Sequence, residues 1–345
     1  MSLPALRIPK LILHIGMYKT GTTSIQEFLC AREAELARAG VLYPKACRHM
    51  RGMPIPGHHA VAAAVAALGN SSDGGRLWQS PDMAQLRAEA EACAPQALLL
   101  SAEDFCSLEN PALLGSAFAA DEVLVLMSVR NQADFVNAMY YTMVGHVRAL
   151  LGPREYLADK LLRVLDYQRI ASRWQAAFPQ TRVVVQSYEK GAPARQDAVR
   201  NFIVSAGLGA ALNVPTQRAS RHPTLPACAT RVLHEMLLLG VAEDEFLTIY
   251  KWAHLVYGDK VPLRSRQCLS PAQIAAIAGS DFEASNRLLR REFMDGVDAS
   301  PFATPAPAPG VEAEPDYFAE NGFALAVRQL ILDGARLGRK SNLGL

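Results

Sequence analysis

Short apolar runs that alternate with helical patterns are the feature that most constrains the fold of this chain. Each run has the length of a buried strand, and the stretch that follows it repeats apolar residues at the spacing of a helix. This alternation is typical of a parallel sheet flanked by helices, so we expect an α/β protein with a three-layer core. The expected strands are residues 11–16, 41–44, 97–101, 123–129 and 182–188, and the expected helices are residues 23–39, 59–68, 132–145, 155–177 and 195–206.

After about residue 215 the strand pattern stops and only helical patterns follow. We therefore expect the α/β core over residues 8–210 and a helical C-terminal part over residues 211–300, packed on the core within the same domain. A Pro/Ala-rich linker is expected over residues 301–316, and a C-terminal helix and tail over residues 317–345. The expected C-terminal helices are residues 224–239, 243–256, 270–278, 281–295 and 317–337.

Composition excludes several classes of protein. The formal net charge of +2 argues against a general nucleic-acid binder. The six cysteines are scattered without a CxxC pair, which favours free thiols over disulfides, and no Cys/His cluster has the ligand spacing of a metal site. No run of about 18 apolar residues predicts a membrane span, and the N-terminus lacks a convincing signal peptide. We expect a soluble, cytoplasmic protein without a metal.

The stretch GMYKTGTT, residues 16–23, lies between a predicted strand and a predicted helix. Unpaired amides at a helix N-terminus and the helix dipole favour an anion there, and Gly21 allows a close backbone approach. A nucleoside triphosphatase loop places lysine after the second glycine, but here Thr22 stands in that place and Lys19 precedes the glycine. The alternative is a strand–turn–helix whose lysine is only solvated.

This arrangement resembles the 5′-phosphosulfate loop of the sulfotransferases that use 3′-phosphoadenosine 5′-phosphosulfate (PAPS). The resemblance implies a P-loop-like fold and PAPS as the sulfuryl donor, without a metal ion. It also implies that Lys19 meets the bridging oxygen between phosphate and sulfate, which makes it both a cofactor-binding and a catalytic residue. The other residues implied to bind PAPS through this loop are Thr20, Gly21, Thr22 and Thr23.

The stretch VLVLMSVRNQADFVNAMYYTMV, residues 123–144, resembles the 3′-phosphate element of the same family. Arg130 and Tyr140 match its arginine and tyrosine, but Ala138 stands where the family has serine. Either one hydroxyl contact is missing or another residue such as Asn137 supplies it. Arg130 alone would be read as a capping or surface arginine, although a guanidinium suits a phosphate monoester.

Three further segments also look like bacterial members of this family, so that the resemblance spans roughly residues 10–295. They are specific mainly by their order and spacing along the chain. The segments are ALLLSAEDF, LDYQRIASRWQAAFPQTRVVVQSYEK and SDFEASNRLLRREF.

Sulfuryl transfer to an alcohol needs a base near the attacking oxygen. Glu103 follows a strand end, where ligands of open α/β sheets bind, and His58 and His59 enter a helix in a stretch where relatives often carry a base. Each has a plain alternative, as a surface carboxylate or as a capping or core histidine. His14 reads as a core residue. His222, beside Arg218 and Arg221, belongs to a basic loop that either closes over the nucleotide or is merely solvated.

The leading hypothesis is a sulfotransferase that moves a sulfuryl group from PAPS to a hydroxyl or amine of a small-molecule or glycan acceptor. The carbohydrate expectation comes from the resemblance alone. One alternative is a P-loop kinase of small molecules, against which the absent GK[ST] lysine and the lack of a Walker-B acidic strand end argue. The other is a non-catalytic nucleotide-binding protein of the same fold, which Ala138 favours.

Overall fold

A computed structural model describes most of the chain, in two compact units. The first unit comprises residues 1–131, 163–216 and 281–303, and the second comprises residues 132–162, 217–280 and 304–345. The described residues are 3–144, 162–188, 197–212, 225–257, 268–269, 274–275, 277, 282–297, 299–302 and 324–332.

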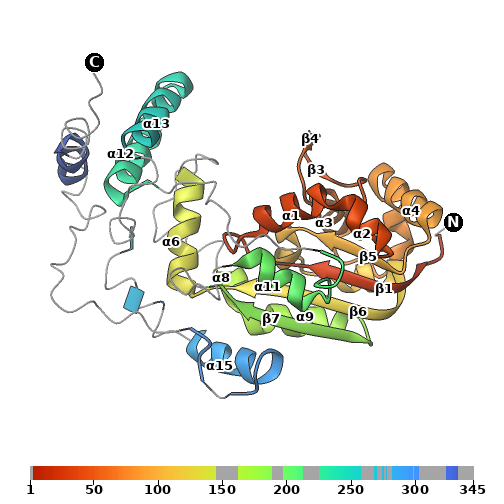
Figure 1. The fold of residues 1–345 in the computed structure, drawn as a ribbon. Helices are drawn as coiled ribbons and strands as arrows, with labels where there is room; N and C mark the ends of the chain where they lie inside the picture. The colour runs from red at the N-terminus through yellow and green to blue at the C-terminus, as the bar shows by residue number, and fades with distance from the viewer. Residues whose placement is uncertain are drawn as a thin grey trace. The chain divides into compact units, whose positions relative to one another are not determined.

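The first unit is built on a parallel sheet with the strand order β2-β5-β1-β6-β7 (Figure 1). Register pairs Leu11 of β1 with Leu98 of β5 and with Val123 of β6, and every neighbouring pair in the sheet is parallel. The expected parallel α/β sheet is therefore confirmed. Its strands are β1 (Leu6–His14), β2 (Val41–Leu42), β5 (Ala97–Ser101), β6 (Phe118–Val129) and β7 (Thr181–Ser187).

Alternate side chains of the sheet enter separate helical layers. Ile12, Leu99 and Leu124 face a core shared with α1 (Thr22–Ala31), α2 (Glu33–Arg38) and α11 (Ala198–Ser205). The intervening residues, such as Leu13 and Leu100, are also fully buried. Right-handed crossovers that run in opposite directions along a sheet put their helices on opposite faces of it. The helix that precedes β7, α9 (Tyr167–Ala177), accordingly contacts β6 and β7 on the second face.

Several elements of the first unit differ from the sequence expectation. The expected helix over residues 23–39 is interrupted at Arg32, whose φ of −119° is not helical. The expected helix over residues 155–177 is helical at 162–165 and 167–177, because the Asp166 carboxylate caps α9 by accepting from the Arg169 amide at 3.1 Å; residues 155–161 lie outside the described residues. Elements without a sequence prediction are β3 (His49–Met50), β4 (Met53–Pro54), η1 (Gly74–Gln79), α4 (Pro81–Cys93), η2 (Glu103–Ser107) and α5 (Ala112–Ala117).

The remaining predicted helices of the first unit are present, and two of them have shorter bounds than expected. α3 (His59–Leu68) matches the expected range, and α11 covers the middle of the range expected at 195–206. α15 (Phe282–Phe293) matches the range expected at 281–295 and packs on α9.

The second unit is helical wherever the structure describes regular secondary structure in it. It contains α6 (Gln132–Thr142), α12 (Ala227–Leu238), α13 (Glu243–Tyr257) and a helical segment at 324–332. These helices share a core that includes Tyr140, Leu233 and Phe246. Most of the expected helix at 270–278 and nearly all of the expected linker at 301–316 lie outside the described residues. None of the helices described in either unit combines the length and apolar character that crossing a membrane requires.

Candidate functional site

Three adjacent strands of the sheet carry the candidate residues at their carboxyl ends. The loop after β1 lies between Glu103, which follows β5, and Arg130, which follows β6. From β1 the chain first builds the sheet toward β5 and β2 and then crosses to β6, so this edge is the topological switch point where ligands of open α/β sheets bind. The amide of Met17 continues the ladder by donating to the Ser128 carbonyl at 3.1 Å.

The loop after β1 holds two residues in the left-handed region of backbone space. Gly21 has a φ of 90° and Lys19 a φ of 63°, which is uncommon for a residue with a side chain and typical of functional sites. A Cβ on Gly21 would lie 2.5 Å from the Ala198 Cβ, so the position requires glycine. Inside the loop, the hydroxyls of Thr20 and Thr22 donate to the Met17 carbonyl at 2.6 and 3.3 Å.

The same loop presents the N-terminus of α1. Gly21 is the N-cap and has no side chain to cap the first amides, and the first turn carries no acidic residue. The first amides of a helix point outward without an intrahelical partner, and the dipole adds partial positive charge. Thr23 and Lys19 are exposed beside them, while Thr20 is buried. An oxyanion of a ligand can therefore be bound here by backbone, hydroxyl and ammonium groups together.

Arg130 joins the loop to the end of β6. Its side chain is buried, and its Nη1 donates to the Lys19 carbonyl at 3.2 Å. Its own carbonyl accepts a hydrogen bond from the Tyr167 hydroxyl at 2.9 Å. Partial loss of hydration is the largest effect on the pKa of Lys19 and lowers it; the Glu103 carboxylate opposes this shift and the Arg130 guanidinium adds to it. Glu103 and Arg130 thus both act electrostatically on Lys19.

A histidine between two carboxylates lies beside the loop. His59 Nδ1 is 2.8 Å from Asp104 Oδ2, and His59 Nε2 is 3.3 Å from Glu103 Oε2. Burial of the ring lowers its pKa, but hydrogen bonds to Asp104 and Glu103 and their charges outweigh burial and raise the pKa to about 9. His59 is therefore an imidazolium at neutral pH, with both ring nitrogens donating.

The two carboxylates of this cluster have further partners. Burial raises the pKa of Glu103, but His59 and the Gln26 amide, which donates to Oε2 at 3.1 Å, hold it below its ordinary value. Asp104 likewise has a pKa below its ordinary value, because His59 and the Tyr18 hydroxyl outweigh burial. Burial raises the pKa of Tyr18, so its phenol stays protonated and donates. Both carboxylates are thus ionised.

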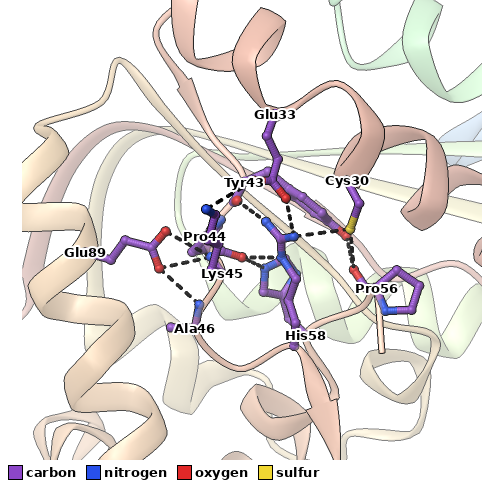
Figure 2. Close-up of polar contacts among 10 residues, drawn as sticks. Cys30, Glu33, Tyr43, Pro44, Lys45, Ala46, Pro56, His58 and Glu89 are labelled. Carbon is purple, nitrogen blue, oxygen red and sulfur yellow. Dashed lines mark hydrogen bonds and ion pairs between the residues drawn. The ribbon is translucent and has the colours of Figure 1, made fainter. Parts of the chain in front are cut away.

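His58 faces the core, unlike its neighbour. Its Nε2 donates to the Pro44 carbonyl at 2.9 Å (Figure 2). Its Nδ1 accepts from the Ser101 amide at 3.1 Å, so both nitrogens are occupied. Burial lowers its pKa to about 3. His58 therefore stays neutral and holds the backbone of β5 and the segment before β3. We assign it a structural role and do not retain it as a candidate base.

The segment that precedes α3 is fixed by Arg48 and Glu89. Arg48 donates to the Tyr43 and Pro44 carbonyls and, at 3.2 Å, to the Cys30 sulfur, while its Nη1 also bonds Glu33. Figure 2 shows the Glu89 carboxylate on the other side of this segment, where it accepts from the Lys45 and Ala46 amides. This cluster orients the chain that enters α3 and so positions His59.

Several residues of the site carry no motif of their own. Tyr18 lies inside the loop and Asp104 directly follows Glu103, so proximity in sequence was the available signal. Gln26 and Ser101 come from α1 and β5, and their hydroxyl–amide contact at 3.3 Å appears only in the folded chain. His14 is a buried core residue as expected; burial lowers its pKa to about 4, and its Nδ1 lies 2.8 Å from Ser101 Oγ.

Other candidate residues belong to the second unit or lie outside the description. Asn137 is in the second unit, where its Oδ1 accepts from the Cys268 amide at 2.7 Å. Tyr140, in the same unit, lies 2.6 Å from His234 Nδ1 through its hydroxyl. The basic loop with Arg218, Arg221 and His222 lies outside the described residues. Within the described ranges, no group of three or more His, Cys, Asp or Glu side chains is arranged to hold a metal ion.

Comparisons with known proteins give one solved structure to report. No family model and no curated protein matches this chain. A crystal structure of a sulfotransferase from Alicyclobacillus acidocaldarius matches at 16% sequence identity, over 72% of this chain and 100% of that chain, with a TM-score of 0.36.

Proposed function

We propose that this protein is a sulfotransferase that moves a sulfuryl group from PAPS to a hydroxyl or amine of an acceptor. The observation that carries the proposal is the position of Lys19 at the N-terminus of α1. Its side chain is exposed, its backbone is in the left-handed region, and it lies between the ionised Glu103 and the buried Arg130. A lysine before the glycine, rather than after it, distinguishes this loop from that of a triphosphatase.

The residues present fit a phosphosulfate. Gly21 and the first amides of α1 would bind the 5′-phosphate, with the Thr23 hydroxyl beside them and Thr20 and Thr22 shaping the loop from within. Arg130 would pair with the 3′-phosphate through its guanidinium group, which suits a phosphate monoester. The contribution of Asn137 to that phosphate stays a proposal.

The chemistry assigned to the site balances without a metal ion. The acceptor oxygen or nitrogen forms a bond to sulfur while the bond from sulfur to the bridging phosphate oxygen breaks. Lys19 stabilises the negative charge that grows on that leaving oxygen. The attacking atom becomes strongly acidic as the new bond forms, so a carboxylate of low pKa suffices to take its proton.

Glu103 is the base that the cluster supports best. His59 is already protonated at neutral pH, so it cannot accept the proton, and we assign it the role of orienting Glu103. Asp104 in turn holds the other nitrogen of His59. The alternative of a P-loop kinase finds no support in this loop, where Thr22 occupies the lysine position and bonds the loop backbone.

Calorimetry would test the proposal directly. Adenosine 3′,5′-bisphosphate should bind more tightly than AMP, and more tightly than ATP whether or not Mg²⁺ is present. A sulfate-transfer assay with PAPS over hydroxyl and amine acceptors, glycans included, should then show turnover that chelators do not reduce. Mg²⁺-dependent ATP binding would favour the kinase, and nucleotide binding without transfer to any acceptor would favour the non-catalytic protein that Ala138 suggests.

A further inference from the structure

A pocket of about 580 Å³ lies in the first unit between the end of η2 and helix α9. Its volume falls in the range of about 300–1,000 Å³ typical of small-molecule sites. Most of its described lining is polar or charged. The lining residues that matter here are Asn70, Ser107, Glu109, Arg169 and Arg173.

The pocket adjoins the proposed sulfuryl-transfer site through two elements. η2 begins with Glu103 and ends with Ser107. A 3₁₀ helix rises about 2 Å per residue, so the backbones of these two residues are about 8 Å apart. The Tyr18 hydroxyl interacts with both Asp104 and Ser107, so the loop after β1 contacts η2 at a residue that also lines the pocket.

The wall opposite η2 is α9, which is anchored next to Arg130. Tyr167, its first residue, donates to the Arg130 carbonyl at 2.9 Å. α9 also packs on η2 through Trp174 and Phe105, whose ring centroids are 6.1 Å apart. The two walls of the pocket are therefore packed against each other, and η2 connects one wall to the carboxylate that we propose as the base.

The described lining of this pocket carries two positive side chains and one negative side chain. Arg169 and Arg173 are one turn apart on α9, an arrangement of like charges that slightly destabilises a helix. Arg173 Nη1 donates to the Leu108 carbonyl at 2.7 Å, which orients its guanidinium. Among the described residues, no carboxylate forms an ion pair with either arginine, and Glu109 is the one acidic side chain in the described lining.

We propose that this pocket binds a carboxylate group of the acceptor, so that the substrate is an acidic, hydroxylated molecule such as a uronic-acid sugar. That the bound molecule is the acceptor rests on the proposed function. Two guanidinium groups one turn apart match a carboxylate by charge-assisted, bidentate hydrogen bonding. Asn70 and Ser107 supply amide and hydroxyl groups for the sugar hydroxyls, and the attacked hydroxyl lies toward Glu103.

Direct binding of two matched probes tests the pocket without PAPS. 4-Nitrophenyl glucuronide and 4-nitrophenyl glucoside share the aryl group and the ring, and they differ in a carboxylate. Titration calorimetry on the full chain should show the glucuronide binding at least tenfold more tightly at low salt, with the preference falling as salt rises. Equal affinities, or no glucuronide binding at millimolar concentration, overturn the inference.

Arginine variants locate the effect. Arg169→Gln should reduce glucuronide affinity on the order of tenfold and leave glucoside affinity unchanged. Arg182→Gln, an exposed arginine of β7 outside the pocket lining, is the matched control and should change neither. Arg173→Gln repeats the test on the second guanidinium, with thermal unfolding measured alongside because it also removes the bond to Leu108. A preference for the glucuronide that survives both substitutions contradicts the assignment.

The same preparations separate this inference from the proposed function. Adenosine 3′,5′-bisphosphate binding depends on the loop after β1 and on Arg130, and Arg169→Gln should leave it intact. Normal nucleotide binding without a preference for the glucuronide refutes the assignment of the pocket and leaves the sulfotransferase proposal standing. Glucuronide preference without any nucleotide binding keeps the acidic-ligand pocket and refutes the sulfotransferase.

Discussion

The hydroxyl of Tyr18, one residue before Lys19, donates a hydrogen bond to Oδ1 of Asp104, one residue after Glu103. This contact joins the loop after β1 to the end of β5, across two strands that are neighbours in the sheet. Lys19, which is proposed to stabilise the leaving oxygen, and Glu103, which is proposed as the base, are therefore each adjacent in sequence to a partner of this hydrogen bond. A shift of either segment moves the other.

Removal of this hydroxyl should cost more stability than removal of a hydroxyl bound to a neutral group. Tyr18→Phe leaves the ionised Asp104 without one of its donors, which should lower the free energy of unfolding by about 1.5–3 kcal/mol. Tyr43→Phe is the matched control, because its hydroxyl donates to the neutral Pro56 carbonyl and should cost about 0.5–1.5 kcal/mol. Urea unfolding of both variants measures the difference. An equal or smaller loss for Tyr18→Phe would show that the contact to Asp104 contributes little.

Stability should fall on the alkaline side because of His59. Its folded-state pKa of about 9 lies above the unfolded value of 6.5, so its contribution is fully present below pH 6.5 and is lost as pH rises through 9. The shift corresponds to at most about 3 kcal/mol. Chemical denaturation of the wild type and of His59→Gln between pH 6 and 9.5 measures it, and the slope should be smaller in the variant. Identical slopes would contradict the raised pKa.

At acid pH, stability should be limited by groups other than His59. His14 and His58 have folded-state pKa values of about 4 and about 3, below the unfolded value of 6.5, so the unfolded chain binds more protons there and stability falls as pH drops below 6.5. The low pKa values of Glu103 and Asp104 add a further loss at lower pH. Maximal stability is expected near pH 6.5–7.

The sequence predicted those parts of the site that depend on local structure. The loop at 16–23 follows from a strand, a glycine and a helix in succession, and Arg130 follows from the end of a buried strand. The different orientations of the His58 and His59 side chains could not be predicted from the sequence. His58 is oriented by backbone groups of Pro44 and Ser101, which come from other segments of the chain. Asp104 and Gln26 were missed for the same reason, since their partners are 45 or more residues away in the chain.

The sequence likewise predicted those parts of the fold that local patterns define. Buried strands such as 97–101 and 123–129 stand out as apolar runs, and parallel pairing follows from the helices between them. The break of the helix at Arg32 was not predicted, because the apolar spacing resumes at Leu36, which packs in the same core as Phe28. Helix α4 was missed since only three of its residues are buried, which leaves a weak apolar stripe.

Arg130→Ala should abolish the preference for a 3′-phosphate. The side chain also supports the Lys19 carbonyl, so the informative quantity is the affinity ratio of adenosine 3′,5′-bisphosphate to AMP, in which an effect on the shared 5′-phosphate cancels. Loss of one charged contact should reduce that ratio by about 1.5–3 kcal/mol, measured by calorimetry. Arg182→Ala serves as the control. If the ratio is unchanged in Arg130→Ala, the 3′-phosphate lies elsewhere.

Lys19 should matter more for turnover than for nucleotide binding, because its contact strengthens as charge develops on the leaving oxygen. Lys19→Ala should lower kcat roughly a hundredfold or more, with a smaller change in nucleotide affinity. Lys19→Gly separates charge from conformation, since glycine adopts the φ of 63° without strain. Both variants should be equally slow, and Lys19→Arg should not restore the rate fully. A Lys19→Gly enzyme with near-native kcat would eliminate the ammonium from catalysis.

The base is identified by comparing pH–rate profiles of three variants. If Glu103 takes the proton, the rate of the wild type should fall at acid pH as this carboxylate becomes protonated, at a pH below the ordinary carboxylate range because His59 lowers the pKa of Glu103. Glu103→Gln should lower kcat and remove this acid limb while PAPS affinity stays near normal. His59→Gln should keep a limb but move it to higher pH, since the pKa of Glu103 is then no longer held down by an imidazolium. His58→Asn should lower stability without moving the limb, because the His58 ring bonds backbone groups of Ser101 and Pro44. An acid limb that stays in place in Glu103→Gln and in His59→Gln means that the proton leaves through a different group.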